Sequence, residues 1–164
     1  MQSLYVVLAL ATLLLASVPG AAAPHFVTSA ACVDCHREQT AAWQKSTHAK
    51  AMQEASAASV LGDFGDVRFE AGGLRARFFR EDRGWFVETE GARHRVAYTF
   101  GVEPLQQILV PAAGGRFQSF PIAWDTRGLR WFHLYPELSL RAGEALHWTG
   151  RYQSWNLMCA DCHS

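Results

Sequence analysis

Two short motifs contain all the cysteines of the chain. In each motif two residues separate the cysteines, and a histidine directly follows the second one: Cys32-Val33-Asp34-Cys35-His36 and Cys159-Ala160-Asp161-Cys162-His163. Thiols at this spacing reach the two vinyl groups of one porphyrin, and the adjacent imidazole reaches the iron as its proximal ligand. The sequence therefore predicts two sites for covalently attached haem c, called here the first and the second motif.

Other uses of paired cysteines explain the motifs less well. Zinc sites, redox-active dithiols and structural disulfides of secreted proteins all employ such pairs. A zinc site does not explain why a histidine directly follows both pairs. A dithiol oxidoreductase places one pair at the start of a helix after a strand, and neither motif has that setting. Two structural disulfides remain a further alternative.

The two motif histidines, His36 and His163, are the predicted proximal iron ligands, so each iron needs a sixth ligand or keeps that position open. His48 lies in a predicted helical stretch, where a continuous helix would place it roughly 18 Å along the axis from His36. It is therefore expected to follow a bend or to serve another haem. His147, which precedes the second motif, is the other candidate distal ligand.

The remaining side chains are weaker candidates for iron binding. Met52 is a conceivable ligand, whereas Met158 is badly placed beside Cys159. His94 and His133 lie in predicted strands, where an isolated histidine is typically a hydrogen-bonded structural residue.

An apolar segment near the N-terminus indicates in which cellular compartment the protein is located. Residues Leu4–Leu15 are apolar apart from Thr12, and small residues follow, ending in Ala21–Ala23. The segment is short for a bilayer, which predicts a secretory signal peptide over residues 1–22. No Lys or Arg precedes it, so an uncleaved anchor is the alternative. Both interpretations place the mature chain outside the cytoplasm, periplasmic or otherwise secreted, as haem c attachment requires.

The composition is that of a globular protein, with 49% apolar and 18% charged residues. Fifteen basic residues balance fifteen acidic ones. This neutrality argues against nucleic acid or an anionic membrane surface as a partner, and no membrane contact beyond the signal peptide is expected. Six Trp and ten Phe suit packing against a porphyrin, although an aromatic-rich core is the favoured explanation.

Periodicity predicts an α+β fold with helical haem-binding segments at both ends flanking an antiparallel β meander. Strong helix formers follow the first motif up to about Leu61, and a helix is expected again from about Trp148. Between them, alternating apolar and charged residues are interrupted by Gly and Asp turns. The expected segments are 23–62 and 139–164 for the haems, with 63–138 as the β-rich part.

Arginines are concentrated in the predicted meander. Most are expected on the solvated face of the sheet, although a haem propionate would accept hydrogen bonds from one or two of them. They are Arg75, Arg77, Arg80, Arg83, Arg93 and Arg95.

The segments beside the motifs resemble a known family. They are similar to multihaem c-type cytochromes of the nitrifier tetrahaem type, and more closely to a bacterial branch in which such a domain precedes tetratricopeptide repeats. In such proteins the histidine that matches His48 is typically a distal haem ligand, and further haem motifs follow. The resemblance covers nearly all of the mature chain and rests on residues Trp43–Ala49, Tyr98–Gly101, Gln106–Gln107, Phe120–Asp125 and His147–Asn156.

The second motif ends one residue before the end of the sequence, at His163. A haem attached there needs chain to cover its exposed face, so the sequence is expected to be the N-terminal part of a longer protein. The predicted function is electron transfer through two bis-histidine haems, with redox partner proteins or further haem domains as partners. The alternatives are a haem enzyme that converts a small nitrogen or sulfur species at an open iron, and a secreted interaction module with structural haem.

Overall fold

The computed structural model describes residues 27–163, so the predicted signal peptide, residues 1–22, lies outside the described residues. The chain divides into two compact units, Met1–Thr40 and Ala41–Ser164. The described part of the first unit contains a 3-10 helix, η1 (Ser29–Cys32), and the start of the helix α2 (Arg37–Lys45). Glu38 in its first turn and Lys45 in its last turn complement the helix dipole. Neither helix has a buried residue.

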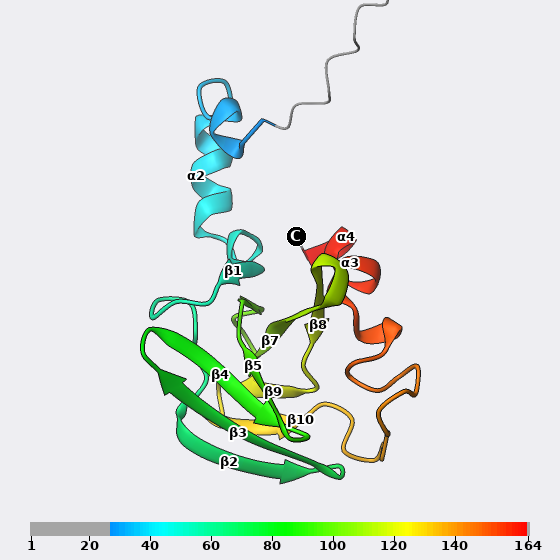
Figure 1. Cartoon of the computed structure of the whole chain (residues 1–164). Helices are drawn as coiled ribbons and strands as arrows, with labels where there is room; N and C mark the ends of the chain where they lie inside the picture. The colour runs from blue at the N-terminus through cyan, green and yellow to red at the C-terminus, as the bar shows by residue number, and fades with distance from the viewer. Residues whose placement is uncertain (1–26, 164) are drawn as a thin grey trace, which may run out of the picture. The chain divides into compact units, whose positions relative to one another are not determined.

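Two antiparallel sheets make up most of the second unit (Figure 1). One is a four-stranded meander in the order β2-β3-β4-β5; the other has six strands in the order β1-β6-β7-β9-β10, with β8 paired to β7. The strands are β1 (Met52–Glu54), β2 (Gly65–Ala71), β3 (Leu74–Glu81), β4 (Gly84–Thr89), β5 (Ala92–Arg95), β6 (Tyr98–Phe100), β7 (Leu105–Ala112), β8 (Arg116–Ser119), β9 (Ile122–Asp125) and β10 (Arg130–His133). The short helices are η2 (His48–Lys50), η3 (Ala113–Gly115), η4 (Arg151–Gln153), α3 (Trp155–Met158) and α4 (Ala160–His163).

The predicted meander is confirmed for β2 to β5, but the β-rich part forms two sheets and not one. The change of sheet occurs in the short stretch between β5 and β6. Val96 donates its N–H to the carbonyl of Trp85 in the first sheet, and Ala97 donates to the carbonyl of Leu109 in the second. Two neighbouring residues thus belong to different sheets, and the hydrophobic pattern alone does not reveal this.

The helical prediction after the first motif was wrong in its second half. The helix α2 ends at Lys45, and β1 follows η2 where a helix was expected. Met52 pairs with Phe100 of β6, and Gly101 donates its N–H to the carbonyl of Ala51. Strand pairing with a distant segment here outweighs the weak local preference for helix. At the C-terminal end, helical structure starts at Arg151 and not at Trp148.

The main core lies between the two sheets and is rich in aromatic side chains. Phe78 of the four-stranded sheet stacks on Trp131 of the six-stranded sheet, with ring centroids 3.8 Å apart. Phe120 and Ile122 are fully buried beside them. Burial of each such side chain contributes about 1.5–3 kcal/mol. An aromatic-rich core therefore accounts for many of the aromatic residues in the composition.

Candidate haem-attachment sites

The first motif forms a helical turn that leads into α2. His36 donates its N–H to the carbonyl of Cys32 at 3.0 Å, and Thr40 donates to the carbonyl of His36 at 2.9 Å. On such a turn residues three apart project to the same side, so the thiols of Cys32 and Cys35 share one face. Both cysteines are exposed and unpaired. This is the local geometry that two attachment points for one porphyrin require.

The second motif has a similar turn. Cys159 lies between α3 and α4, and Cys162 donates its N–H to the carbonyl of Cys159 at 3.2 Å. Cys162 is exposed, whereas Cys159 is partly buried, and this burial raises the pKa of the Cys159 thiol. No disulfide joins the four cysteines, all of which lie in the described part of the chain.

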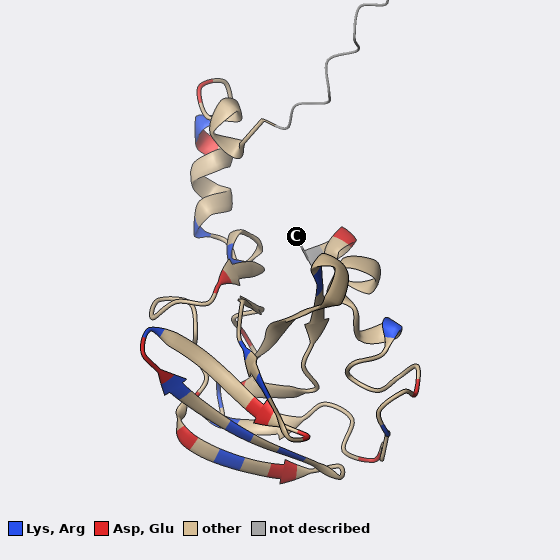
Figure 2. Cartoon of the chain, in the orientation of Figure 1, with Lys and Arg blue, Asp and Glu red and all other residues tan. Residues whose placement is uncertain are grey.

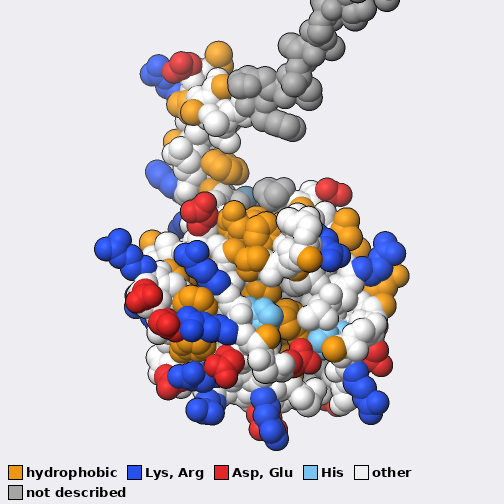
Figure 3. All heavy atoms as spheres, viewed as in Figure 1, with side chains coloured by type: hydrophobic (Ala, Val, Ile, Leu, Met, Phe, Trp, Pro, Cys, Tyr) orange, Lys and Arg blue, Asp and Glu red, His pale blue; other side chains and the backbone are white. Residues whose placement is uncertain are grey.

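An apolar cluster, called here the aromatic platform, packs against Cys159 and Ala160. Its buried members are Phe100, Leu109 and Trp155, and its partly buried members are Met52, Tyr98 and Phe117. Figure 3 shows hydrophobic side chains gathered between β1 and the C-terminal helices. The second motif therefore lies beside an apolar, aromatic cluster of the kind that can pack against a porphyrin.

Sequence reasoning did not identify the aromatic platform. Its rings form two pairs, Tyr98 with Phe117 and Phe100 with Trp155, each with centroids 5.0 Å apart. The sequence of β6 could have indicated that both faces of this strand are covered, because Tyr98 and Phe100 alternate with the buried Thr99. A strand with apolar or buried residues on both faces needs cover on both sides. That residues near the C-terminus cover this face of β6 could be seen only in the tertiary structure.

The candidate distal ligand His147 is buried, and both of its ring nitrogens have partners. Its Nε2 lies 3.2 Å from a carboxylate oxygen of Glu90, and its Nδ1 lies 2.8 Å from the hydroxyl of Thr149. The other carboxylate oxygen of Glu90 accepts a hydrogen bond from the indole of Trp148. In this arrangement His147 offers no free nitrogen to an iron, and its contacts are those of a structural residue.

The other candidate, His48, has different surroundings. It begins η2, is exposed, and belongs to the same compact unit as the second motif. Four residues further along this segment, Met52 packs on the aromatic platform with Cys159. The structure thus places the His48 segment in the unit of the second motif, which sequence spacing from the first motif did not indicate.

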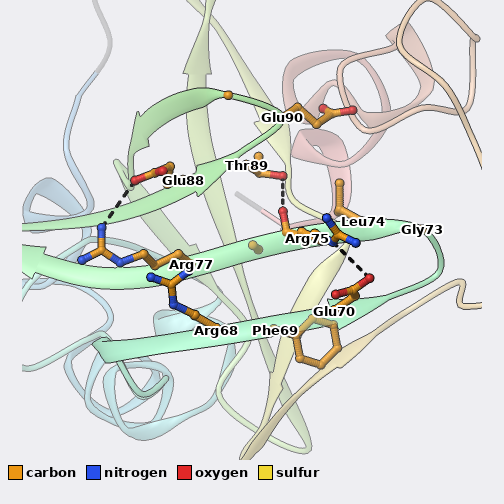
Figure 4. Close-up of a pocket in the computed structure, with 12 residues that line it drawn as sticks. Arg68, Phe69, Glu70, Gly73, Leu74, Arg75, Arg77, Glu88, Thr89 and Glu90 are labelled. Atoms are coloured by element: carbon orange, nitrogen blue, oxygen red, sulfur yellow. Dashed lines mark hydrogen bonds and ion pairs between the residues drawn. The ribbon is translucent and has the colours of Figure 1, made fainter.

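A groove of about 860 Å³ is lined by residues of β2, β3 and β4 (Figure 4). Four of its charged side chains form two pairs: Arg75 lies 3.1 Å from Glu70, and Arg77 lies 3.5 Å from Glu88. Figure 2 shows acidic and basic residues interspersed along these strands. Exposed pairs of this kind contribute little stability. The arrangement agrees with the expectation that most meander arginines lie on the solvated face.

Two further observations concern the described residues as a group. Within residues 27–163, no three His, Cys, Asp or Glu side chains are placed to hold a metal ion together. In the same range, no helix combines the length and the apolar character that a membrane span requires.

The motifs and their turns define a class, the c-type cytochromes, in which haem is bound through paired cysteines and an adjacent histidine. Comparison with known proteins shows a partial similarity: residues 31–62 match the family model of cytochrome c554 and c-prime, a multihaem c-type cytochrome family. No curated protein and no solved structure matches the chain. The match implies haem c, iron and electron transfer for this segment, and c-type cytochromes are generally extracytoplasmic.

The residues present fit the haem that the match implies. Each motif presents free thiols three positions apart on a helical turn, and the second motif lies against an aromatic platform. The second motif lies outside the matched range, so its assignment rests on its own residues and surroundings.

Proposed function

We propose that the protein is a periplasmic multihaem c-type cytochrome that carries electrons through two covalently bound haems. Cys32 and Cys35 hold one haem and Cys159 and Cys162 hold the other. His36 and His163 are the proximal ligands. The observation that carries the proposal is the pair of Cys-x-x-Cys-His turns, one of them within a segment that matches a multihaem cytochrome family.

Each bound haem supplies one-electron chemistry, because its iron alternates between the ferric and ferrous states. The chain's own residues set the surroundings of this chemistry. The aromatic platform places an apolar surface beside the second motif, and an apolar environment tunes a reduction potential. The partners that we propose are redox proteins or further haem domains, reached after export directed by residues 1–22.

For the distal ligands we favour His48 over His147. The imidazole of His48 is exposed, whereas iron binding by His147 would require the loss of its contact with Glu90 or Thr149. Because His48 belongs to the unit of the second motif, the second haem is its first candidate partner.

The haem content of the purified protein tests the proposal. Mass spectrometry should show two haems, on peptides containing Cys32–His36 and Cys159–His163, and both should be low-spin in the absorption spectrum. A carrier with six-coordinate iron should bind carbon monoxide slowly or not at all. Rapid binding to a high-spin haem would instead favour the enzyme alternative, and absence of haem from either motif would contradict the proposal.

Ligand variants test the choice of histidine. The variant His48→Gln should convert one haem to a high-spin form, because a glutamine amide is a poor iron ligand. His147→Gln is the matched control, and it should leave both haem spectra unchanged while lowering the stability by about 1–3 kcal/mol. The opposite result would make His147 the ligand.

A further inference from the structure

The second motif follows a segment that is bound to the edge of a sheet. The strand β8 is an edge strand that pairs with β7 on one side, and its Phe117 lies opposite Pro111. Pro111 has no N–H to donate. Three positions further along the paired strands, Phe120 donates its N–H to the carbonyl of Ile108, so that pair is hydrogen-bonded. Hydrogen-bonded and non-hydrogen-bonded pairs alternate along antiparallel strands. Phe117 and Pro111 therefore form a pair without mutual hydrogen bonds, and the N–H of Phe117 points away from β7.

Asn156 meets this outward-pointing group. Its Oδ1 accepts a hydrogen bond from the N–H of Phe117 at 2.8 Å. Just before it, Ser154 forms an isolated antiparallel bridge with Gln118 of the same strand. Figure 1 shows α3, which begins at Trp155, beside β8. The segment that carries the second motif thus covers the free edge of β8.

A second set of hydrogen bonds comes from the side chain of Gln118, which is only 4% exposed. Its Nε2 donates to the carbonyl of Trp148 at 3.1 Å and to that of Gly150 at 3.0 Å. Its Oε1 has no partner among the described residues, so this side chain acts through its two donated bonds. Residues 148–156 are consequently tied to β8 at both ends.

The hydrogen bonds of Asn156 and Gln118 hold the segment that packs Cys159 against the aromatic platform. Trp155, one position before Asn156, is 3% exposed and lies in the aromatic platform with Cys159. Asn156 lies in α3, a single helical turn that ends one residue before the first thiol of the motif. An isolated turn of this length is not stable by itself, so its position depends on these tertiary contacts.

We propose that Asn156 and Gln118 are positioning residues for the haem of the second motif. They hold residues 148–158 on β8 and so keep Cys159 partly buried against the aromatic platform. This proposal rests on the proposed function, because it assigns these residues a role toward a haem attached there. Loosening the segment should admit water beside that haem and favour its more highly charged ferric form, which lowers its reduction potential.

The test uses the haem-loaded full chain and the variants Asn156→Leu and Gln118→Leu. The reduction potential of the second haem should shift to a more negative value, while that of the first haem stays unchanged. Potentials are assigned with a Cys32→Ala/Cys35→Ala variant, which keeps the second haem alone. Hydrogen exchange of residues 154–158 should accelerate by roughly fivefold to tenfold, as expected for the loss of one hydrogen bond.

Two controls separate positioning from general stability. Gln106 is a second buried glutamine, 1% exposed, whose side chain bonds to Leu61, Ser59 and Gly101 and not to the segment before the second motif. Gln106→Leu should lower the unfolding midpoint without a change in either potential. Asn156→Asp keeps an acceptor for the N–H of Phe117, so exchange of residues 154–158 should stay close to that of the wild type.

The outcomes are distinguishable from failure of the proposed function. If both variants leave the second potential and the local exchange unchanged, the positioning role is overturned. If the wild-type protein carries no haem on Cys159 and Cys162, the proposed function fails instead. The exchange comparison then still decides whether Asn156 and Gln118 hold the segment on β8.

Discussion

Burial changes the titration of two histidines in the β-rich part. Desolvation lowers the pKa of His133, whose Nδ1 accepts a hydrogen bond from the N–H of Tyr135 at 3.0 Å. Desolvation also lowers the pKa of His94, and the charge of Glu90 opposes this effect. The ring of His94 meets that of Trp148 edge to face. Both residues favour the neutral imidazole in the folded state.

The pH dependence of stability follows from this preference. A lowered pKa means that, below the ordinary value of 6.5, the unfolded chain binds protons that folded His133 does not. The stability contributed by the neutral imidazole should therefore be fully present above about pH 7 and decrease as the pH falls below about 6.5. The variant His133→Asn keeps an acceptor for the N–H of Tyr135 without a titrating group. On lowering the pH, the urea midpoint of this variant should therefore decrease less than that of the wild type. Parallel pH profiles for the two proteins would contradict this account.

At the scale of elements, the connection between β6 and β7 leaves little room at Gly101. Gly101 has a φ of +79° and donates its N–H to the carbonyl of Ala51, next to β1. A Cβ at this position would lie 2.7 Å from the carbonyl oxygen of Leu105. The turn between β4 and β5 offers a comparison, because Gly91 has a φ of +75° with open space around it.

This pair of glycines separates backbone strain from steric overlap. Gly91→Ala should cost about 1–2 kcal/mol of unfolding free energy, from the left-handed conformation alone. Gly101→Ala should cost a further ~1–3 kcal/mol, because the backbone atoms of Leu105 must move. Denaturant unfolding of both variants measures the difference. Equal costs would show that the β6–β7 connection relaxes freely around the added methyl group.

At the scale of the whole molecule, the main core is built without the cysteines of the motifs. Its buried members run from Phe64 to Trp148 and come from both sheets. In the second unit a haem would therefore add to a core that already exists between the sheets. The residues of η1 and α2 are all at least partly exposed and have no such core.

A haem-free chain should consequently keep the fold of its second unit. We expect a variant with alanine in place of Cys32, Cys35, Cys159 and Cys162 to unfold cooperatively in urea. Its near-ultraviolet circular dichroism should retain the signal of packed aromatic residues, because Phe78, Trp131 and their neighbours stay between the sheets. Loss of that signal with retained secondary structure would show instead that haem is required for specific packing.

The sequence by itself determined the features that depend on near neighbours. Haem attachment needs two thiols and an imidazole within one helical turn, so the motifs predict their chemistry from spacing alone. The hairpins of β2 to β5 follow from alternation and glycine turns in the same way. The match of residues 31–62 to a cytochrome family model agrees with these local patterns, since the matched segment starts at the first motif.

Only the tertiary structure decided which distant residues meet. Met52, Tyr98 and Trp155 form one platform because β1 pairs with β6 and α3 docks on β8. His48 and His147 look alike in the sequence, yet one is exposed and the other is held by Glu90. Local preferences are weak compared with the burial and pairing that a complete fold provides, so sequence spacing could predict the haem motifs but not their surroundings.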